Sequence, residues 1–186
     1  MPWRIDSPPQ TGPAGPADLL ITTNNYLEPP VERTLVLFKP DAVQRNLVGT
    51  ILSRFESKGL KVVGLKLRQF PRPLIEGHYS DHKERPFYAG LVDYMTSGPV
   101  VALALEGVDA IEVTRKLMGA TNARKAEPGT IRGDLGMSFS NNLVHGSDSP
   151  EAAAKELALF FPEAEETVEW TPANLPWMYN VAEELN

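Results

Sequence analysis

The segment TLVLFKPDAVQRNLVGTILSRFESKGLKVVGLKL, residues 34–67, decides the fold. Its first five residues are apolar except for Thr34 and are stopped by Pro40, which predicts a buried strand with Lys39 at its end. The next apolar residues follow the helical spacing i, i+3, i+4, i+7 and share one face: Val48, Ile51, Leu52 and Phe55. Gly59 ends this helix, and residues 60–67 return to a strand-like pattern. The order is therefore strand, helix, strand.

The remainder of the chain predicts a second strand–helix–strand half after a mixed region. Residues 72–94 are polar and aromatic, with short helices broken at Pro86. Residues 100–105, VVALAL, form the third strand, and Asp109 is expected to cap a helix that ends at Gly119. A fourth strand is expected within residues 137–144. Ser149 then starts a last helix, with Ser as the N-cap and Pro at the first turn.

This order predicts an α+β protein with the ferredoxin-like βαββαβ plan, a four-stranded antiparallel sheet covered by helices on one face. Between its second helix and fourth strand lies the segment 120–136, punctuated by Gly and Pro. A connection of this length in a compact domain is usually functional. We therefore expect the segment to contribute to a binding site.

Composition limits the classes of function. The 186 residues form a chain with 42% hydrophobic and 23% charged residues, as in an ordinary globular domain. No apolar run reaches the roughly 20 residues that cross a bilayer. The absence of cysteine excludes disulfides, thiolate metal sites and cysteine nucleophiles. A net charge of −6 disfavours binding to nucleic acid.

Two parts of the chain are expected. Residues 1–31 are rich in Pro and have no apolar periodicity, so they predict an N-terminal arm that is either a flexible tail or a wrap around a neighbouring subunit. Because the arm lacks a secretory core, we expect a cytoplasmic protein. Residues 32–186 form the domain. This domain includes the aromatic segment from Thr167 to Asn186, which we expect to pack on the domain or on a neighbouring subunit.

His145 is the strongest candidate for a reactive side chain. It lies in the sequence NNLVHGSD, after an apolar stretch that predicts a strand, and Gly146 beside it permits close backbone approach. Phosphoryl transfer through histidine needs a neutral imidazole, a carboxylate that orients it and cations around the phosphate. Glu156 on the next helix could supply the carboxylate. Taken singly, such acids and bases are ordinary surface residues, so only their combination is informative.

Two other kinds of site are disfavoured by the sequence. The chain has neither GxxxxGK[ST] nor GxGxxG, so a P-loop or dinucleotide fingerprint is excluded. His78 and His82 are four residues apart, a spacing that can bind zinc on a helix. Pro86 follows closely and no HExxH motif is present, which makes that pair an improbable zinc site.

Four separated motifs resemble those of the nucleoside diphosphate kinase family: TLVLFKPDAVQRNLVG, HYSDHKERPFYAGLVDYMTSGPVVA, MGATNARKAEPGTIRGD and NNLVHGSDS. The resemblance extends from Glu32 to about Tyr179. It implies a Mg²⁺-dependent, ping-pong transfer of the γ-phosphoryl group from a nucleoside triphosphate, typically ATP, to a nucleoside diphosphate. The phosphoryl carrier implied by the resemblance is His145, as a phosphohistidine.

The resemblance also implies roles for other residues. Glu156 and Ser147 match the positions that orient the histidine, and Lys39 matches a catalytic, phosphate-binding position. Asp148 matches an acid near Mg²⁺, which the family holds mainly through the nucleotide's phosphates and water. The remaining matches are nucleotide-binding positions, with the base stacking on an aromatic ring: Tyr79, Phe87, Leu91, Arg115, Thr121, Arg132, Phe139 and Asn142. A homo-oligomer is implied as well, with the aromatic C-terminal segment favouring a hexamer over a tetramer.

Two positions depart from the family pattern. Phe139 replaces a smaller aliphatic residue opposite the stacked base, which leaves the base preference open. Ala123, in TNARKAEPG, replaces a proline that fixes a loop near subunit contacts. Besides an active kinase, the sequence leaves two functions to be separated by experiment: a nucleotide-binding scaffold with weak turnover, and a phosphohistidine relay to protein partners.

Overall fold

The computed structural model describes residues 31–180. They belong to two compact units, residues 30–172 and a unit that includes the C-terminal residues from Ala173, and each is described by itself. The expected arm lies outside the described residues, except that Val31 already begins the first strand. Within the described part of the C-terminal unit, Leu175–Met178 form a short helix, α8. No helix among the described residues is both long and apolar enough to cross a membrane.

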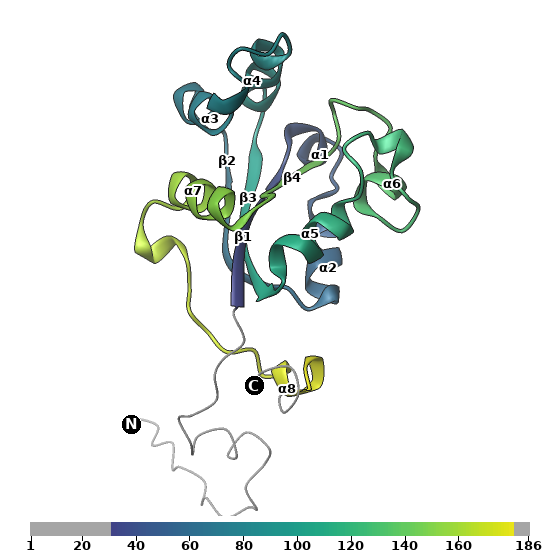
Figure 1. Cartoon of the computed structure of the whole chain (residues 1–186), viewed down its shortest axis with the longest axis vertical. Helices are drawn as coiled ribbons and strands as arrows, with labels where there is room; N and C mark the ends of the chain where they lie inside the picture. The colour runs from purple at the N-terminus through teal and green to yellow at the C-terminus, as the bar shows by residue number, and fades with distance from the viewer. Residues whose placement is uncertain (1–30, 181–186) are drawn as a thin grey trace, which may run out of the picture. The chain divides into compact units, whose positions relative to one another are not determined.

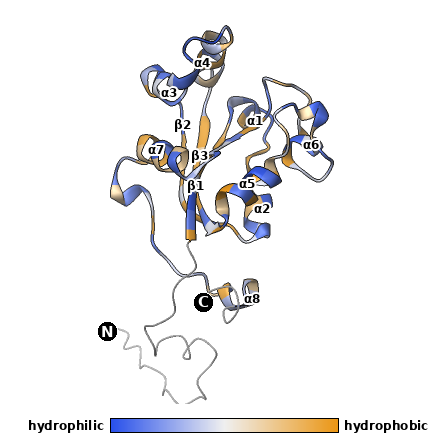
Figure 2. Ribbon diagram, viewed as in Figure 1, coloured by the Kyte–Doolittle hydropathy of each residue, from blue (hydrophilic) through white to orange (hydrophobic). Residues whose placement is uncertain are grey.

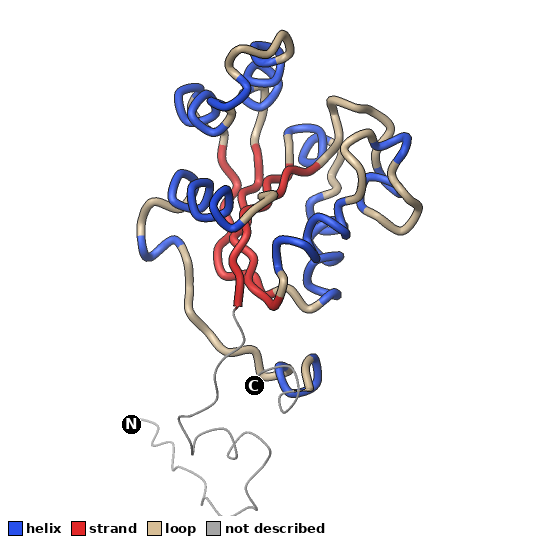
Figure 3. The backbone as a smooth tube through the Cα atoms, in the orientation of Figure 1, coloured by secondary structure: helices blue, strands red, loops and turns tan. Residues whose placement is uncertain are grey.

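The core of the larger unit is one four-stranded antiparallel sheet in the order β2-β3-β1-β4 (Figures 1 and 3). The strands are β1 (Val31–Phe38), β2 (Lys61–Arg68), β3 (Val100–Val108) and β4 (Val144–Gly146). β1 pairs with β3 along its whole length and with β4 near its end. The α+β, ferredoxin-like class predicted from the sequence is confirmed.

Helices cover both faces of this sheet, whereas the sequence predicts them on one face. α2 (Val48–Lys58) and α5 (Ala110–Met118) lie on one side in Figure 1, and α7 (Pro150–Phe160) lies on the other. The physical reason is visible in β1, where Leu35 and Leu37 enter one apolar cluster while Val36 and Phe38 enter another. A strand that is apolar at every position must be buried on both faces.

Shorter helices complete the two layers. α1 (Pro40–Gln44) and α6 (Ile131–Leu135) accompany α2 and α5, whereas α3 (Arg72–His78) and α4 (Tyr88–Thr96) contribute to the cluster around α7. Single 3₁₀ turns occur at Ser80–His82, Ala123–Lys125 and Ala164–Glu166. In Figure 2 the sheet strands carry much of the hydrophobic colour, and the helices have mixed faces. The pattern is that of amphipathic helices on an apolar sheet.

Two local expectations are wrong. The fourth strand is the three-residue β4, Val144–Gly146, and not a longer strand within residues 137–144. Asp109 does not cap α5, because its backbone is left-handed (φ 50°) and its side chain makes no capping bond. The backbone N–H of Ile111 instead donates to Glu32 Oε2 from the start of β1, at 3.2 Å. A residue distant in sequence has replaced the local cap.

Part of the aromatic C-terminal segment packs on the domain, as expected. The backbone N–H of Val168 donates to the carbonyl of Val63, and Trp170 Nε1 donates to the carbonyl of Val62. Lys61 Nζ lies 5.8 Å from the centre of the Trp170 ring. β2 is at the edge of the sheet, so these contacts give some of its free backbone groups a partner.

Candidate active site

The pairing register of β4 determines where the candidate nucleophile points. His145 is the middle residue of β4 and lies opposite Leu37 of β1, so it belongs to the strand itself and does not follow it. Paired residues of adjacent strands project to the same face. Leu37 packs in the cluster that contains Phe160 of α7, and the imidazole of His145 therefore faces α7. Because β4 is an edge strand, this imidazole is partly accessible, with its side chain 25% exposed.

A carboxylate and a hydroxyl hold the imidazole in one orientation. His145 Nε2 lies 2.9 Å from Glu156 Oε1, and Ser147 Oγ donates to Glu156 Oε2 at 2.6 Å. Burial pushes the pKa of Glu156 upward, but the hydrogen bonds from His145 and Ser147 and the nearby imidazole charge hold it below its usual value. An ionised carboxylate can only accept hydrogen bonds, so the nitrogen facing it must be the one that carries a hydrogen. In the neutral imidazole, Nε2 therefore carries the hydrogen and Nδ1 keeps its lone pair.

Lys39 contributes a buried cation at the end of β1. Its Nζ donates to Asn142 Oδ1 at 2.7 Å. Burial and the charge of Arg132 lower the pKa of Lys39 to about 8. Because its partner is a neutral amide, the charge of this ammonium group is not neutralised by a carboxylate. A buried, uncompensated cation binds a phosphate oxygen favourably.

Arg132 is fixed by backbone carbonyls. Its guanidinium donates to the carbonyl oxygens of Gly119, Asn142 and Val144 at 2.7, 3.2 and 2.8 Å. Burial and the neighbouring Arg115 lower its pKa to about 10. Arg115 Nη1 approaches the carbonyl of Gly146 at 3.4 Å. Both guanidinium groups thus lie beside β4, and neither forms a salt bridge with a carboxylate among the described residues.

Tyr79 and His78 supply buried polar atoms next to His145. The Tyr79 hydroxyl and both ring nitrogens of His78 are buried and make no hydrogen bond within residues 31–180. Burial raises the pKa of Tyr79. Burial and the adjacent His145 lower the pKa of His78 to about 3, so its imidazole is neutral near pH 7. Unsatisfied buried polar groups are costly in a folded protein, and their concentration here indicates a site that receives a ligand.

These residues line a cavity of about 510 Å³. Most of the site residues predicted from the sequence lie together in its wall: Lys39, Tyr79, Arg115, Thr121, Arg132, Asn142, His145, Asp148 and Glu156. Ser147 lies behind Glu156. Phe87, Leu91 and Phe139 are outside the wall: Leu91 is half-buried, whereas Phe87 and Phe139 are 56% and 59% exposed. Phe87 is linked to the cavity through His82, whose ring centre is 5.7 Å away.

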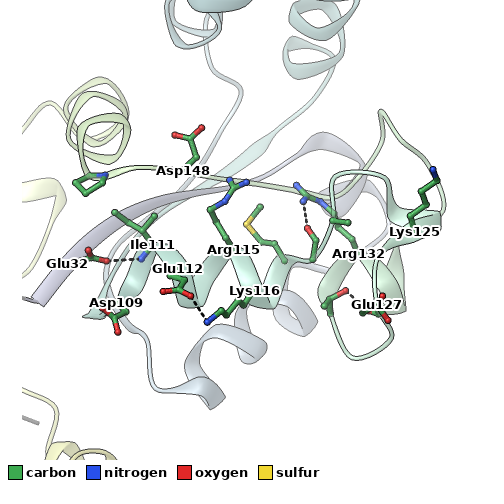
Figure 4. A pocket seen from close by; sticks show the side chains of 15 residues that line it. Glu32, Asp109, Ile111, Glu112, Arg115, Lys116, Lys125, Glu127, Arg132 and Asp148 are labelled. Atoms are coloured by element: carbon green, nitrogen blue, oxygen red, sulfur yellow. Dashed lines mark hydrogen bonds and ion pairs between the residues drawn. The ribbon is translucent and has the colours of Figure 1, made fainter.

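A second hollow of about 720 Å³ lies along α5 (Figure 4). It shares Arg115, Arg132 and Asp148 with the cavity around His145. Its other charged groups include the ion pair between Glu112 and Lys116 on α5. No histidine lines this groove, so the smaller cavity is the candidate active site.

Several structural details of the site were missed from the sequence. Asp41 Oδ1 accepts the Tyr94 hydroxyl and its Oδ2 accepts the N–H of Leu143, which joins α1, α4 and the start of β4. Leu143 is fully buried with φ 71°, a left-handed conformation that costs on the order of 1 to 2 kcal/mol outside glycine. Strain of this kind marks functional segments. The KPD sequence contains Asp41, but its partners depend on tertiary structure.

An oriented imidazole, buried cations and a cavity on an α+β fold together define an enzyme of the phosphotransferase class. Comparison with known families agrees, because the family model described as "Nucleoside diphosphate kinase" matches residues 32–166. The chain belongs to the nucleoside diphosphate kinase family.

Individual relatives support this membership. A nucleoside diphosphate kinase of Synechococcus sp. (strain JA-3-3Ab) is 56% identical over 149 residues, 80% of this chain and 99% of the relative. The chloroplastic nucleoside diphosphate kinase 2 of Spinacia oleracea is 54% identical over 148 residues, 80% of this chain and 63% of that protein. The solved structure of a halophilic relative from Halobacterium salinarum, in complex with CDP, has 49% identity and a TM-score of 0.77. It covers 80% of this chain and 98% of its own.

Proposed function

We propose that this chain transfers the γ-phosphoryl group of a nucleoside triphosphate to a nucleoside diphosphate, and that His145 carries the group between the two half-reactions. The single observation that supports this most is the hydrogen bond between His145 Nε2 and Glu156. It leaves Nδ1 as the nitrogen with an available lone pair. An imidazole held in this way is an activated and oriented nucleophile.

In the first half-reaction, Nδ1 forms a bond to the γ-phosphorus while the bond from that phosphorus to the β–γ bridging oxygen breaks. The nucleoside diphosphate leaves with the bridging electron pair. The positive charge that develops on the ring is balanced by Glu156, whose bond to Nε2–H remains in place. The second half-reaction is the reverse with another diphosphate. One cavity serves both, which makes the kinetics ping-pong.

The cations of the cavity stabilise the transferred group. The transition state of phosphoryl transfer spreads negative charge over the equatorial oxygens. Lys39, Arg115 and Arg132 line the same wall as His145 and meet this charge from fixed positions. Tyr79, Thr121 and Asn142 add neutral polar groups for the phosphates and the sugar. We assign base stacking to Phe87, next to Leu91, and place Phe139 on the opposite side of the base.

Mg²⁺ is the cation that we propose for the nucleotide. Asp148 lines the cavity with an exposed carboxylate, and oxygen is the ligand type that Mg²⁺ prefers. Glu156 is already engaged by His145 and Ser147, so Asp148 is better placed to act on the ion through water. The ion neutralises phosphate charge when it is bound.

We also propose an oligomeric state, domain bounds and a cellular compartment for the enzyme. A homo-oligomer, as a hexamer, is supported by the family membership and by the exposed Leu65 and Leu67 on edge strand β2, at 51% and 57% exposure. We assign residues 1–31 to an arm that precedes the domain of residues 32–186, and the cytoplasm as the compartment. Sedimentation of the full chain tests the hexamer, since dimers or tetramers would contradict it.

The function is tested by labelling the purified chain with ATP that carries a labelled γ-phosphate. We expect an acid-labile adduct on His145 that GDP or dCDP discharges. His145→Ala should abolish the adduct while nucleotide still binds, because the phosphate-binding cations remain. His82→Ala, the matched control at another histidine of the cavity wall, should retain the adduct. A chain that binds nucleotide but never carries label would be a scaffold instead of a kinase.

A further inference from the structure

Three ligand-bearing side chains meet beside the cavity from separate elements. His78 comes from the end of α3, His145 from β4 and Glu156 from α7. One potential ligand atom from each lies within 4.8 Å of the other two. His78 was considered above as a partner of His82, yet the fold brings it to His145 and Glu156, with the rings of His78 and His145 4.7 Å apart and perpendicular.

The distances fit a transition-metal ion. Zn²⁺ binds nitrogen and carboxylate oxygen at about 2.0 to 2.2 Å, so tetrahedral ligands lie about 3.3 Å from one another. Glu156 Oε1 lies 2.9 Å from His145 Nε2 and 3.6 Å from His78 Nδ1. One separation is slightly shorter and the other slightly longer than the tetrahedral value, and the ligand nitrogens of His78 and His145 lie within 4.8 Å of each other. The three residues could therefore bind an ion with small side-chain adjustments.

His78 is the residue that the phosphoryl-transfer mechanism does not use. Its side chain is 1% exposed, and neither ring nitrogen has a hydrogen-bond partner in the described part of the chain. The rings of Tyr79 and Phe160 also pack against it. Its Nδ1 lies 3.6 Å from Glu156 Oε1, and a neutral imidazole beside a carboxylate is a donor set that late first-row cations prefer.

We propose that His78, His145 and Glu156 form an inhibitory binding site for a late first-row divalent cation, represented by Zn²⁺. Three protein ligands leave a fourth position for water, as in other three-ligand zinc sites. Mg²⁺ does not compete well for such a set, because it prefers oxygen ligands in octahedral geometry. The proposed site is therefore distinct from the Mg²⁺ that accompanies the nucleotide.

Inhibition follows from the tautomer of His145, and this consequence depends on the proposed function. At present Nε2 carries the hydrogen and donates it to Glu156. A metal on Nε2 needs the lone pair of that nitrogen, so the hydrogen moves to Nδ1 and no proton leaves the protein. Nδ1 is then an N–H donor and can no longer attack phosphorus. Conversely, a phosphoryl group on Nδ1 keeps the hydrogen on Nε2 and excludes the metal.

Metal binding is tested without nucleotide, on the chelator-treated full chain. We expect one Zn²⁺ per chain by calorimetry, and visible absorption bands of tetrahedral Co²⁺ when cobalt is the probe. His78→Gln should weaken Zn²⁺ binding at least about tenfold. If the His78→Gln variant does not fold, His78→Phe is used in its place, because a phenyl ring suits the aromatic surroundings. His82→Ala should bind Zn²⁺ as the unaltered chain does.

Inhibition is tested by loading the chain with Zn²⁺, removing unbound metal by gel filtration and adding labelled ATP with Mg²⁺. We expect the loaded chain to lose most of its labelling, and His78→Phe to lose none when treated identically. A chain phosphorylated first should bind Zn²⁺ at least about tenfold less tightly.

Equal Zn²⁺ binding by the His78 variants, or its loss in His82→Ala, would overturn the site. Full labelling of the zinc-loaded chain would overturn the inhibition alone. A chain that binds Zn²⁺ as expected yet is never labelled, even without zinc, would contradict the proposed function and leave the metal site standing.

Discussion

At the scale of single residues, the chemistry depends on how each charged group is held. Lys39 and Arg132 are both buried cations, but their partners differ. Arg132 is fixed by three backbone carbonyls, whereas Lys39 is held by the side chain of Asn142. Of the two, only Lys39 has a pKa that falls within the range in which the enzyme can be assayed, at about 8. Its protonation state is therefore open to direct measurement.

Nucleotide binding should weaken as the pH rises through about 8, because Lys39 loses its charge there. A bound phosphate stabilises the ammonium and raises its pKa, so binding is strongest below pH 8 and falls above it. We expect kcat/KM for the triphosphate, which reports on the unphosphorylated enzyme, to fall up to about tenfold per pH unit above pH 8. Steady-state assays between pH 7 and 9.5 measure this.

Two variants of Lys39 separate its titration from other effects. Lys39→Met should have a low kcat/KM at every pH and a flat profile in this range. Lys39→Arg keeps its charge throughout, so its profile should also be flat. A profile of the unaltered chain that stays level to pH 9.5 would contradict the assignment of the alkaline limb to Lys39.

At the scale of elements, the site depends on connections between segments that are distant in sequence. Ser147 accepts the backbone N–H of Leu35 and donates to Glu156, which links β1, the end of β4 and α7. Gly146 allows β4 to approach α5, because a Cβ there would lie 2.7 Å from Met118 Sδ. The elements that carry His145, Glu156 and Arg115 are therefore held together by these contacts.

The N-terminus of α5 should depend on Glu32 and not on Asp109. Glu32 Oε2 accepts the Ile111 N–H and places a negative charge at the positive end of the helix. Glu32→Ala should lower the free energy of unfolding by about 1 kcal/mol, the usual value of a helix cap. Asp109→Gly, the matched change, should cost nothing, since glycine suits its left-handed backbone. Urea unfolding of both variants measures the difference, and equal losses would contradict it.

The loop after α5 should be stabilised by Ala123→Pro. Ala123 begins a 3₁₀ turn, and Asn122 before it is extended (φ −81°, ψ 104°), as a residue before proline must be. Proline at this position reduces the freedom of the unfolded chain and should raise the free energy of unfolding by about 0.4 to 1 kcal/mol. Thermal unfolding checks the sign. A lower Tm would show that the buried site, only 3% exposed, has no room for the ring.

The elements predicted well from the sequence are those with strong local patterns. α2 has the bounds expected from Val48 to Gly59, and Ser149 caps α7 through the N–H of Ala152, as predicted. β4 was misplaced because three residues have too little periodicity to define a strand, and its existence depends on pairing with β1. The cap of α5 was misassigned for a related reason. Its acceptor, Glu32, is 79 residues away from Ile111.

For the candidate site, the sequence named residues that the structure brings together, although their roles stay predictions. The motif around His145 predicted a reactive imidazole, and the start signal at Ser149 placed Glu156 on the next helix. The structure adds the reason why the side chain of His145 faces α7, which is the pairing of His145 with Leu37. The approach of His78 to both was missed because it depends on how α3 packs against α7, which no local pattern encodes.

At the scale of the whole molecule, a net charge of −6 surrounds a cavity lined by cations. The overall charge keeps polyanions away, whereas the local field of Lys39, Arg115 and Arg132 attracts a small anion that can enter the cavity. Burial in the cavity also affects folding, because it keeps the imidazole of His78 neutral near pH 7.

Acid should destabilise the folded chain through His78. Its pKa is about 3 in the folded state, lowered by burial and by His145, against about 6.5 in the unfolded chain. Between these values the unfolded chain binds one more proton, so stability falls with falling pH by up to about 1.4 kcal/mol per unit and stops falling below pH 3. From pH 7.5 to pH 5, the unaltered chain should lose about 2 kcal/mol more than His78→Phe in urea unfolding. His82→Phe, at an exposed histidine, should lose as much as the unaltered chain. An equal loss in His78→Phe would show that His78 does not carry the acid sensitivity, because that variant has no imidazole to protonate at this position.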